Sequence, residues 1–327
     1  MSKSVYAIIG LGNISSRHRK NLRTLFPDAH IACLSASGRT IDKLPEDCDI
    51  LVDTIEQMIE LKPEFSIIAS PATHHARHAI PFLKNQIPVL IEKPIAASMK
   101  DAELIIEAAI KHTTPAAVAY CLRYKPFILD IKEHLKQKTI GKIVNVEIVA
   151  GSYLPDWRPG KNYLESVSAS ESLGGGVLLE LSHELDYALW ILGKMDLHKS
   201  YISDSKILGL SVEEEARLDF TLESEGQCSI HLDFLQKKPV RYANFHGTNG
   251  KIFWNLQHNT LKIITSQSSE ALAMDGWNSN DMYVDMLNDF SSNFLLHKSN
   301  QLASIDGSAT VLSYIDRAKY LSSTGLS

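Results

Sequence analysis

The sequence predicts an α/β protein that opens with a doubly wound parallel sheet. Up to about residue 120, short apolar runs alternate with stretches of helical periodicity, which is typical of parallel strands joined by crossover helices. The runs are apolar or β-branched throughout, as expected of strands covered on both faces. After residue 125 this alternation ends, and 327 residues are enough for a second domain. We therefore expect one domain at residues 1–122 and another at 123–327.

The first domain shows its elements in order. Its strands are expected at residues 5–9, 31–34, 65–69, 89–91 and 116–120, and its helices at residues 15–25, 55–61, 74–85 and 99–112. In such a sheet, ligands bind at the carboxyl edge of the strands.

The second domain has a different pattern of expected helices and strands. A helical segment to about residue 138 and a strand at 143–150 precede a long polar and aromatic loop through residue 171. Three glycines at 174–176 then lead into an amphipathic helix that reaches residue 192. Alternating apolar residues between 200 and 264 predict a meander of antiparallel strands. Helices are expected again at 281–296 and 307–321, the last of which could pack back on the first domain.

The composition limits the class of protein. Apolar residues make up 44% of the chain and charged residues 22%, as in folded globular proteins. The net charge is −5 and there is no basic block, so we expect no nucleic-acid partner. No apolar run approaches the length of a membrane span, and the first is too short for a signal peptide. The four dispersed cysteines show no metal-ligand spacing. We interpret the chain as cytoplasmic, with structural thiols and no metal site.

A glycine-rich turn follows the first expected strand. Gly10, Gly12, Asn13, Ile14 and Ser15 stand between that strand and the first helix. A run of this kind brings backbone amides and a helix N-terminus close to a pyrophosphate. An ordinary turn is the alternative, but the order of strand, turn and helix favours dinucleotide binding.

The residues after the second strand bear on the choice of dinucleotide. An acidic side chain at this position would bind the 2′-hydroxyl of NAD. The sequence instead has Ser35, Ser37 and Arg39, which suit a 2′-phosphate. We therefore expect NADP in preference to NAD, the alternative being that these are turn residues and a solvated charge.

Two further turns follow strands at the same expected edge. Ser70 and Pro71 are candidate contacts of the cofactor, and Thr73 is expected to cap the next helix. His75 is interpreted either as a structural residue or as part of the site.

Glu92, Lys93 and Pro94 end the fourth expected strand. A charged pair is costly at this position unless it faces a cleft. Lys93 can donate to a substrate hydroxyl and take part in proton transfer. A salt bridge is the alternative for Glu92, and it would leave Lys93 unexplained.

The helix after the three glycines carries polar groups that can converge. Glu180, His183, Glu184 and Tyr187 are spaced to share one helical face opposite an apolar stripe. That polar face must look into solvent or into a cleft. A histidine beside carboxylates is a suitable general acid or base near neutral pH.

Together these motifs resemble one family, the Gfo/Idh/MocA oxidoreductases. The likeness rests on the glycine turn, on Glu92-Lys93-Pro94, on Arg123 and on the glycine-led helix with His183. It implies an N-terminal Rossmann domain followed by an α+β domain with a large, mostly antiparallel open sheet. Such a sheet commonly forms the subunit interface, which implies a homodimer or homotetramer.

The resemblance also implies roles for individual residues. Lys93 and His183 would be the proton-handling pair, and both Lys93 and Glu92 would lie at the cofactor. Glu180 precedes His183 by three residues, where the family commonly has an Asp four residues before the His. The local sequence around Trp157 is similar to that of a subgroup associated with surface-polysaccharide sugars.

Hydride transfer between NADP and a secondary alcohol or ketone of a sugar-like substrate is the resulting hypothesis. His183 would take the hydroxyl proton while Lys93 orients the oxygen. The candidate substrate contacts, besides those two residues, are Arg123, Trp157, Arg158 and Tyr163, although Trp157 and Tyr163 could instead anchor the loop or an interface. A nicotinamide-dependent glycoside hydrolase and a non-catalytic dinucleotide sensor are the two alternative functions.

Overall fold

The computed structural model describes residues 3–39, 41–298 and 300–324 and divides into two compact units. The first unit comprises the residues through Cys121 together with Ser279–Leu312. The second comprises Leu122–Asn278 and the residues from Ser313 onward. The first break lies within a residue of the expected boundary, whereas residues 279–312 were expected in the second domain.

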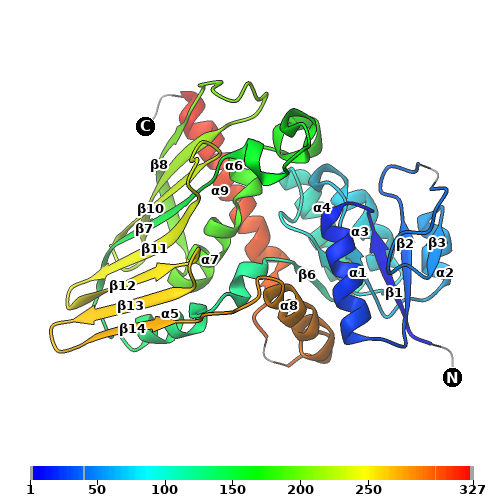
Figure 1. The fold of residues 1–327 in the computed structure, drawn as a ribbon, viewed down its shortest axis with the longest axis horizontal. Coiled ribbons are helices and arrows are strands. Elements are labelled where there is room, and N and C mark those ends of the chain that lie inside the picture. Colours follow the sequence, from blue (N-terminus) through cyan, green and yellow to red (C-terminus); the bar gives the residue numbers. More distant parts are fainter. Residues whose placement is uncertain (1–2, 40, 299, 325–327) are drawn as a thin grey trace. The chain divides into compact units, whose positions relative to one another are not determined.

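The first unit is built on a parallel sheet with the strand order β15-β6-β5-β4-β1-β2-β3 (Figure 1). Its parallel strands are β1 (Val5–Ile9), β2 (His30–Leu34), β3 (Ile50–Val52), β4 (Phe65–Ile68), β5 (Val89–Ile91) and β6 (Ala116–Val118). The short β15 (Ala303–Ser304) pairs antiparallel with β6. The order reverses between β1 and β4, and this switch point is where open α/β sheets bind ligands.

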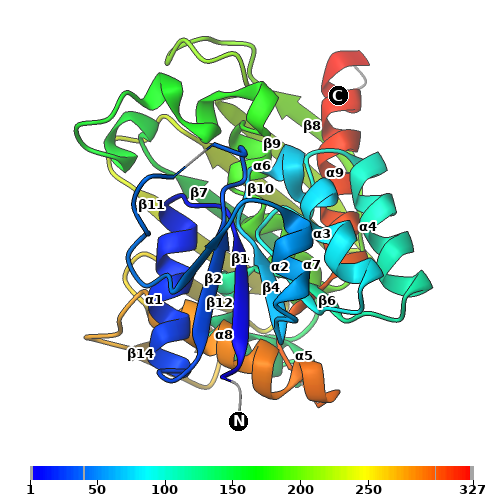
Figure 2. The ribbon, with the colours of Figure 1, turned by 90° about the vertical axis from the view of Figure 1, so that its right-hand side faces the viewer.

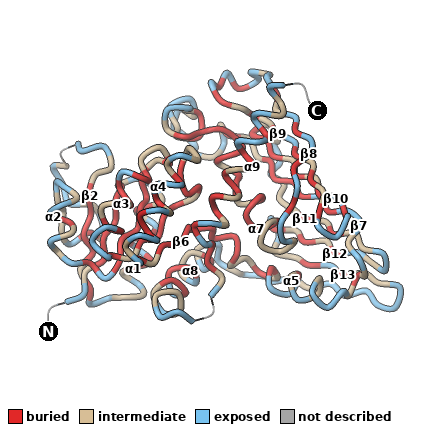
Figure 3. Tube along the Cα trace, turned by 180° about the vertical axis from the view of Figure 1, so that it is seen from behind, coloured by how far each residue is buried: buried red, intermediate tan, exposed pale blue. Residues whose placement is uncertain are grey.

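Helices cover both faces of this sheet, which explains its nearly continuous apolar strands. They are α1 (Asn13–Leu25), α2 (Ile55–Glu60), α3 (His75–Lys84), α4 (Met99–Lys111) and α8 (Asp281–Ser292). Figure 2 shows α1 on one side of β1 and α3 and α4 on the other. Strands β2 and β6 are buried along most of their length (Figure 3). The predicted doubly wound sheet is thus confirmed.

Helix α8 joins the first unit because it packs on α1. Phe290 of α8 lies edge-to-face on Phe65, with ring centroids 5.2 Å apart. The amide of Asn280, just before α8, donates to Asn21 Oδ1 at 2.8 Å. A helix distant in sequence therefore completes one face of the sheet.

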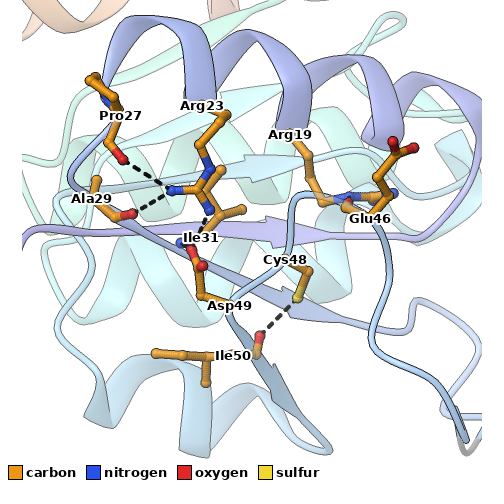
Figure 4. A network of polar contacts seen from close by, with 9 residues as sticks. All are labelled: Arg19, Arg23, Pro27, Ala29, Ile31, Glu46, Cys48, Asp49 and Ile50. Carbon is orange, nitrogen blue, oxygen red and sulfur yellow. Dashed lines mark hydrogen bonds and ion pairs between the residues drawn. The ribbon is translucent and has the colours of Figure 1, made fainter.

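The residues that lead into β2 and into β3 are tied to α1 by polar contacts (Figure 4). Arg23 of α1 donates to the carbonyl of Ala29 at 2.8 Å and to the carboxylate of Asp49 at 2.5 Å. Arg19 donates from Nε to the carbonyl of Glu46 at 2.7 Å. These contacts fix the approach to β3, an edge strand that the sequence analysis missed because it has only three half-buried apolar residues.

The second unit is built on a sheet with the order β14-β13-β12-β11-β7-β10-β9-β8 (Figure 1). These strands are β7 (Ile143–Gly151), β8 (Met195–Ile202), β9 (Glu215–Leu222), β10 (Gln227–Asp233), β11 (Val240–Gly247), β12 (Gly250–Asn255), β13 (Thr260–Thr265) and β14 (Ser269–Ala273). Neighbours are antiparallel except β7 and β10, which run parallel. The expected mostly antiparallel open sheet is confirmed.

Alternation along the strands explains why one face of this sheet is buried. In β9, Ala216, Leu218, Phe220 and Leu222 are buried, while the residues between them are half-buried or exposed. The helices of the unit are α5 (Ile128–Lys136), α6 (Val177–Glu180), α7 (His183–Leu192) and the later part of α9 (Ile305–Thr324). Tyr314 of α9 packs edge-to-face on Phe220 with centroids 5.2 Å apart. In the described ranges, no helix has the length and apolar character of a membrane span.

Candidate functional site

The turn after β1 has the conformation that a pyrophosphate-binding loop needs. Gly10 has φ +118°, and a Cβ at this position would overlap the carbonyl oxygen of Ala69. Gly12 is the N-cap of α1, and a Cβ there would meet nothing within 4 Å. Because Asn13 is exposed and Ile14 half-buried, the first amides of α1 are open to a ligand. An anion is favoured at such a helix N-terminus.

Ser15 occupies the position of the third glycine in the dinucleotide fingerprint. Its side chain is buried and donates to the carbonyl of Gly10 at 2.6 Å. Arg19 Nη1, one turn further along α1, donates to Ser15 Oγ at 2.9 Å. The hydroxyl is therefore satisfied inside the unit, and the serine braces the turn without blocking it.

Glu92 is held by a histidine that the sequence analysis did not identify as functional. His18 Nε2, from the buried face of α1, lies 2.6 Å from Glu92 Oε1. The backbone N–H of Lys93 donates to Glu92 Oε2 at 3.3 Å. Glu92 thus has a buried partner, and its expected contact with the cofactor stays a prediction. The available signal was that a carboxylate at the end of a buried strand needs a partner.

His75 is buried and joins two turns of the carboxyl edge. Its Nε2 lies 2.8 Å from the carbonyl oxygen of Ser70, and its Nδ1 lies 2.9 Å from that of Pro94. Burial lowers the pKa of His75, while the carbonyl contacts act in the opposite direction. The ring fixes the loop that carries Lys93, which is itself half-buried. A contact between His75 and the cofactor stays a prediction. The peptide bond between Lys93 and Pro94 is cis.

The turn after β4 differs from the expected capping arrangement. Pro71 is the N-cap of a short 3₁₀ helix (Ala72–His74), and no side chain caps either that helix or α3. The prediction that Thr73 caps the helix is therefore wrong, because a 3₁₀ turn leads directly into α3. Ser70 is buried and its hydroxyl contacts His78 Nδ1 at 2.9 Å.

The loop after β2 presents the side chains expected for cofactor choice. Ser35 Oγ and Ser37 Oγ lie 3.3 Å apart, and Ser37 and Arg39 are exposed. Gly38 takes φ +68° and lets the loop turn. No carboxylate stands between residues 35 and 39.

In the second unit, the helix expected to carry the polar face is divided. Helix α6 ends at Glu180 and α7 begins at His183. At the break, the N–H of Glu184 bonds to the carbonyl of Leu181, three residues back, at 3.3 Å. This tight turn interrupts the regular helix, so the expected shared helical face of Glu180 and His183 is not formed. Both side chains are half-buried.

The other polar residues of this segment are buried in the second unit. Glu184 accepts two hydrogen bonds from Arg241 of β11, at 2.7 and 2.9 Å. Tyr187 is enclosed and packs edge-to-face on Trp254 with centroids 5.5 Å apart. The expectation that these two residues face solvent or a cleft is wrong, because the sheet covers this side of α7.

Arg123 also has a structural partner. Its Nε and Nη2 donate to the two carboxylate oxygens of Asp186 at 2.8 and 2.7 Å. The side chains are only 6% and 2% exposed. Burial raises the pKa of Asp186, and the guanidinium opposes that rise. Arg123 is thus part of a buried bidentate ion pair, and its expected contact with the substrate stays a prediction.

Trp157, Arg158 and Tyr163 line one pocket in the long loop of the second unit. The pocket has a volume of about 460 Å³. The indole N–H of Trp157 donates to Ser152 Oγ at 2.8 Å, and the hydroxyl of Tyr163 donates to the carbonyl of Leu208 at 3.1 Å. The polar ends of both aromatic residues anchor the loop, while Arg158 is exposed at the pocket.

The first unit therefore brings four features to the carboxyl ends of β1, β2, β4 and β5. They are the glycine turn at residues 10–15, the loop with Ser35 and Ser37 (the serine loop), the turn at Ser70 and Lys93. Together with the strand order, this arrangement defines a dinucleotide-binding α/β domain.

Comparison with known proteins identifies the family. Residues 5–120 match the model of the Gfo/Idh/MocA oxidoreductase family, with an NAD-binding Rossmann fold, and residues 128–253 match the Gfo/Idh/MocA C-terminal domain. The chain belongs to this family and is a nicotinamide-dependent oxidoreductase. The resemblance stated from the sequence motifs is confirmed.

Individual relatives are distant. The oxidoreductase YteT of Bacillus subtilis (strain 168) is 28% identical over 43% of this chain, and the match spans 33% of that protein. The scyllo-inositol 2-dehydrogenase (NAD(+)) of the same organism is 25% identical over 80% of this chain and 77% of its own length. A solved levoglucosan dehydrogenase in complex with NADH and levoglucosan has a similar fold, with a TM-score of 0.86 and 16% identity; the match covers 100% of this chain and 98% of that one.

Proposed function

We propose that this protein catalyses reversible hydride transfer between NADP(H) and a secondary alcohol or ketone of a sugar-like substrate. The observation that carries the proposal is the open amide end of α1 at the carboxyl edge that also holds Lys93. The residues fit a dinucleotide, because Gly10 takes a positive φ and Gly12 leaves space for a diphosphate. When bound, the nicotinamide supplies or accepts the hydride.

Two residues of the chain would manage the proton. His183 takes the proton of the substrate hydroxyl during oxidation and returns it during reduction. Lys93 donates a hydrogen bond to the same oxygen. The His18–Glu92 pair and His75 support Lys93, because they hold the backbone on both sides of it. Glu180, which ends the preceding helix, is the candidate carboxylate partner of His183 in the same reaction.

Several finer features belong to the same proposal. The sugar-like substrate is inferred from the scyllo-inositol and levoglucosan dehydrogenases, and the wording around Trp157 points to a surface-polysaccharide sugar. Trp157, Arg158 and Tyr163 offer a rigid pocket in which a sugar ring can stack. The absence of a carboxylate after β2 supports NADP over NAD.

Assembly and location are also proposals. The exposed face of the second sheet has a depression of about 470 Å³ lined by residues such as Glu147, Arg217 and Tyr242. This mixture of charge and aromatic surface suits a second copy of the chain, in a homodimer or homotetramer. The four buried free cysteines suit the reducing cytoplasm.

The test is a screen of inositols, sugars and nucleotide-linked sugars with both oxidised cofactors, followed by two substitutions. Lys93→Met and His183→Asn should each lower turnover by about a hundredfold to ten-thousandfold, with dinucleotide affinity nearly unchanged. Lys136→Met and His258→Asn, at exposed positions, are the matched controls.

Three results would reject the proposal. Full turnover in either Lys93→Met or His183→Asn would remove the assigned roles. Cleavage of glycosides without net accumulation of reduced cofactor would favour the hydrolase. Tight dinucleotide binding without turnover of any substrate in the screen would favour the sensor.

A further inference from the structure

A chain of hydrogen bonds links the turn after β4 to the loop after β2 through α3. Ser70 Oγ contacts His78 Nδ1 at 2.9 Å, and Arg77 Nε donates to His78 Nε2 at 3.2 Å. Arg77 Nη2 then donates to the carbonyl oxygen of Ala36 at 2.8 Å. Arg77 was not among the residues that the sequence analysis selected. Its guanidinium is held beside the loop that contains Ser35 and Ser37.

The protonation state of His78 fixes the direction of these bonds. Burial, followed by the charges of Arg77, His74 and His75, lowers the pKa of His78 to about 3. The ring is therefore neutral at physiological pH, with one nitrogen that donates and one that accepts. Because a guanidinium can only donate, Nε2 is the acceptor and Nδ1 carries the proton toward Ser70. The neutral ring thus orients Arg77 without repelling it.

Arg77 retains donors for a ligand. A guanidinium has five N–H groups in a planar fork, and the contacts to His78 and Ala36 use two of them. Within the part of the chain that the structure describes, no acceptor bonds to Nη1. The side chain is exposed, so an anion can approach the fork. Two fixed acceptors reduce the conformational entropy that Arg77 loses when it binds that anion.

The position of this fork indicates which anion it binds. In a doubly wound sheet, the residues after β2 contact the 2′ position of the adenosine ribose. Here that loop offers two hydroxyls and Arg39, and it has no carboxylate to repel a phosphate. We propose that Arg77, together with Arg39, binds the 2′-phosphate of NADP(H) and determines the cofactor preference. This inference rests on the proposed dinucleotide function and extends it to a residue of α3.

The experiment compares nucleotide affinities of the full-length protein and its variants by fluorescence titration. Arg77→Gln should weaken NADPH binding by about tenfold to a hundredfold, the worth of a hydrogen bond to a charged group, and leave NADH binding within about twofold. Displacement by 2′-AMP should weaken in parallel with NADPH, whereas displacement by 5′-AMP should not. Arg39→Gln should act in the same sense. Lys84→Gln, at an exposed position of the same helix, should change none of these affinities.

The outcomes separate this inference from the proposal on which it rests. If Arg77→Gln weakens NADPH and NADH equally, Arg77 only braces the loop and the inference is overturned. If the wild-type protein prefers NADPH and the Arg77→Gln variant keeps that preference, the role of Arg77 in cofactor choice is rejected, while the proposed NADP preference stands. Tighter binding of NADH by the wild-type protein would reject the proposed NADP preference, while a selective loss of NADPH in Arg77→Gln would still support the contact.

Discussion

The carboxyl edge of the first sheet and the α6–α7 segment of the second unit both carry polar residues, yet they differ in what those residues do. At the sheet edge, Gly12, Ser37 and Arg39 remain accessible after the chain has folded. In the α6–α7 segment, Glu184 and Asp186 are buried in bidentate ion pairs with arginines. A polar residue directly after a parallel strand has its location set by topology. The sequence does not show whether a polar face of a helix will lie in solvent, in a cleft or against another element, because that depends on which elements pack around it.

The largest expected effect comes from the buried ion pair between Arg123 and Asp186. Asp186→Asn removes the charge that compensates Arg123, and breaking a buried pair costs about 3–5 kcal/mol of the free energy of unfolding. Glu225→Gln is the control, because the Lys142–Glu225 pair is 57% and 86% exposed and should contribute at most about 1 kcal/mol. Denaturant unfolding monitored by fluorescence measures both changes. Similar losses in the two variants would show that the Arg123–Asp186 pair is not structural.

An intermediate effect on stability is expected at the glycine turn, where Gly10 and Gly12 should respond differently to alanine. Gly10→Ala should cost about 1–3 kcal/mol of the free energy of unfolding from backbone strain at positive φ, with further loss from the overlap with Ala69. Gly12 has φ −78° and open space, so Gly12→Ala should cost only about 1 kcal/mol or less, from the loss of a favoured N-cap residue, while it weakens dinucleotide binding. Thermal unfolding with and without NADPH distinguishes the two. A Gly12→Ala variant that binds NADPH like the wild type would contradict the assignment of the turn.

The smallest effect concerns the pH dependence of the hydrogen-bond chain through His78. Its pKa is about 3 in the folded protein, against an ordinary value of 6.5. Between these two values the unfolded chain binds more protons, so stability rises with pH in this window and falls as the solution is acidified below about 6.5. The slope from one such group is at most about 1.4 kcal/mol per pH unit. His78→Gln should flatten the stability profile between pH 5 and 6.5 by part of this slope, and unchanged steepness would argue against a neutral buried ring.

Much of the candidate site was predictable because its signals are local. The glycine turn, the serine loop and Lys93 each follow an apolar run, and the parallel topology brings such positions to one edge. His18 and Arg77 were missed because a cationic or titratable residue on an α-helix usually indicates only a solvated face. Their partners, Glu92 and Ala36, are 74 and 41 residues away in the chain. Only the path of the chain shows which residues they contact.

The sequence by itself determined the alternation of strands and helices, the antiparallel meander and the chemistry of the turns, because hydrophobic periodicity and glycine conformation act over a few residues. The tertiary structure decided which unit α8 joins, where the helix before His183 is interrupted, and which charges neutralise one another. Arg123 meets Asp186 across 63 residues and Glu184 meets Arg241 across 57. Pairings of this kind depend on how the elements pack, since burial makes an uncompensated charge costly and gives it a partner wherever the fold supplies one.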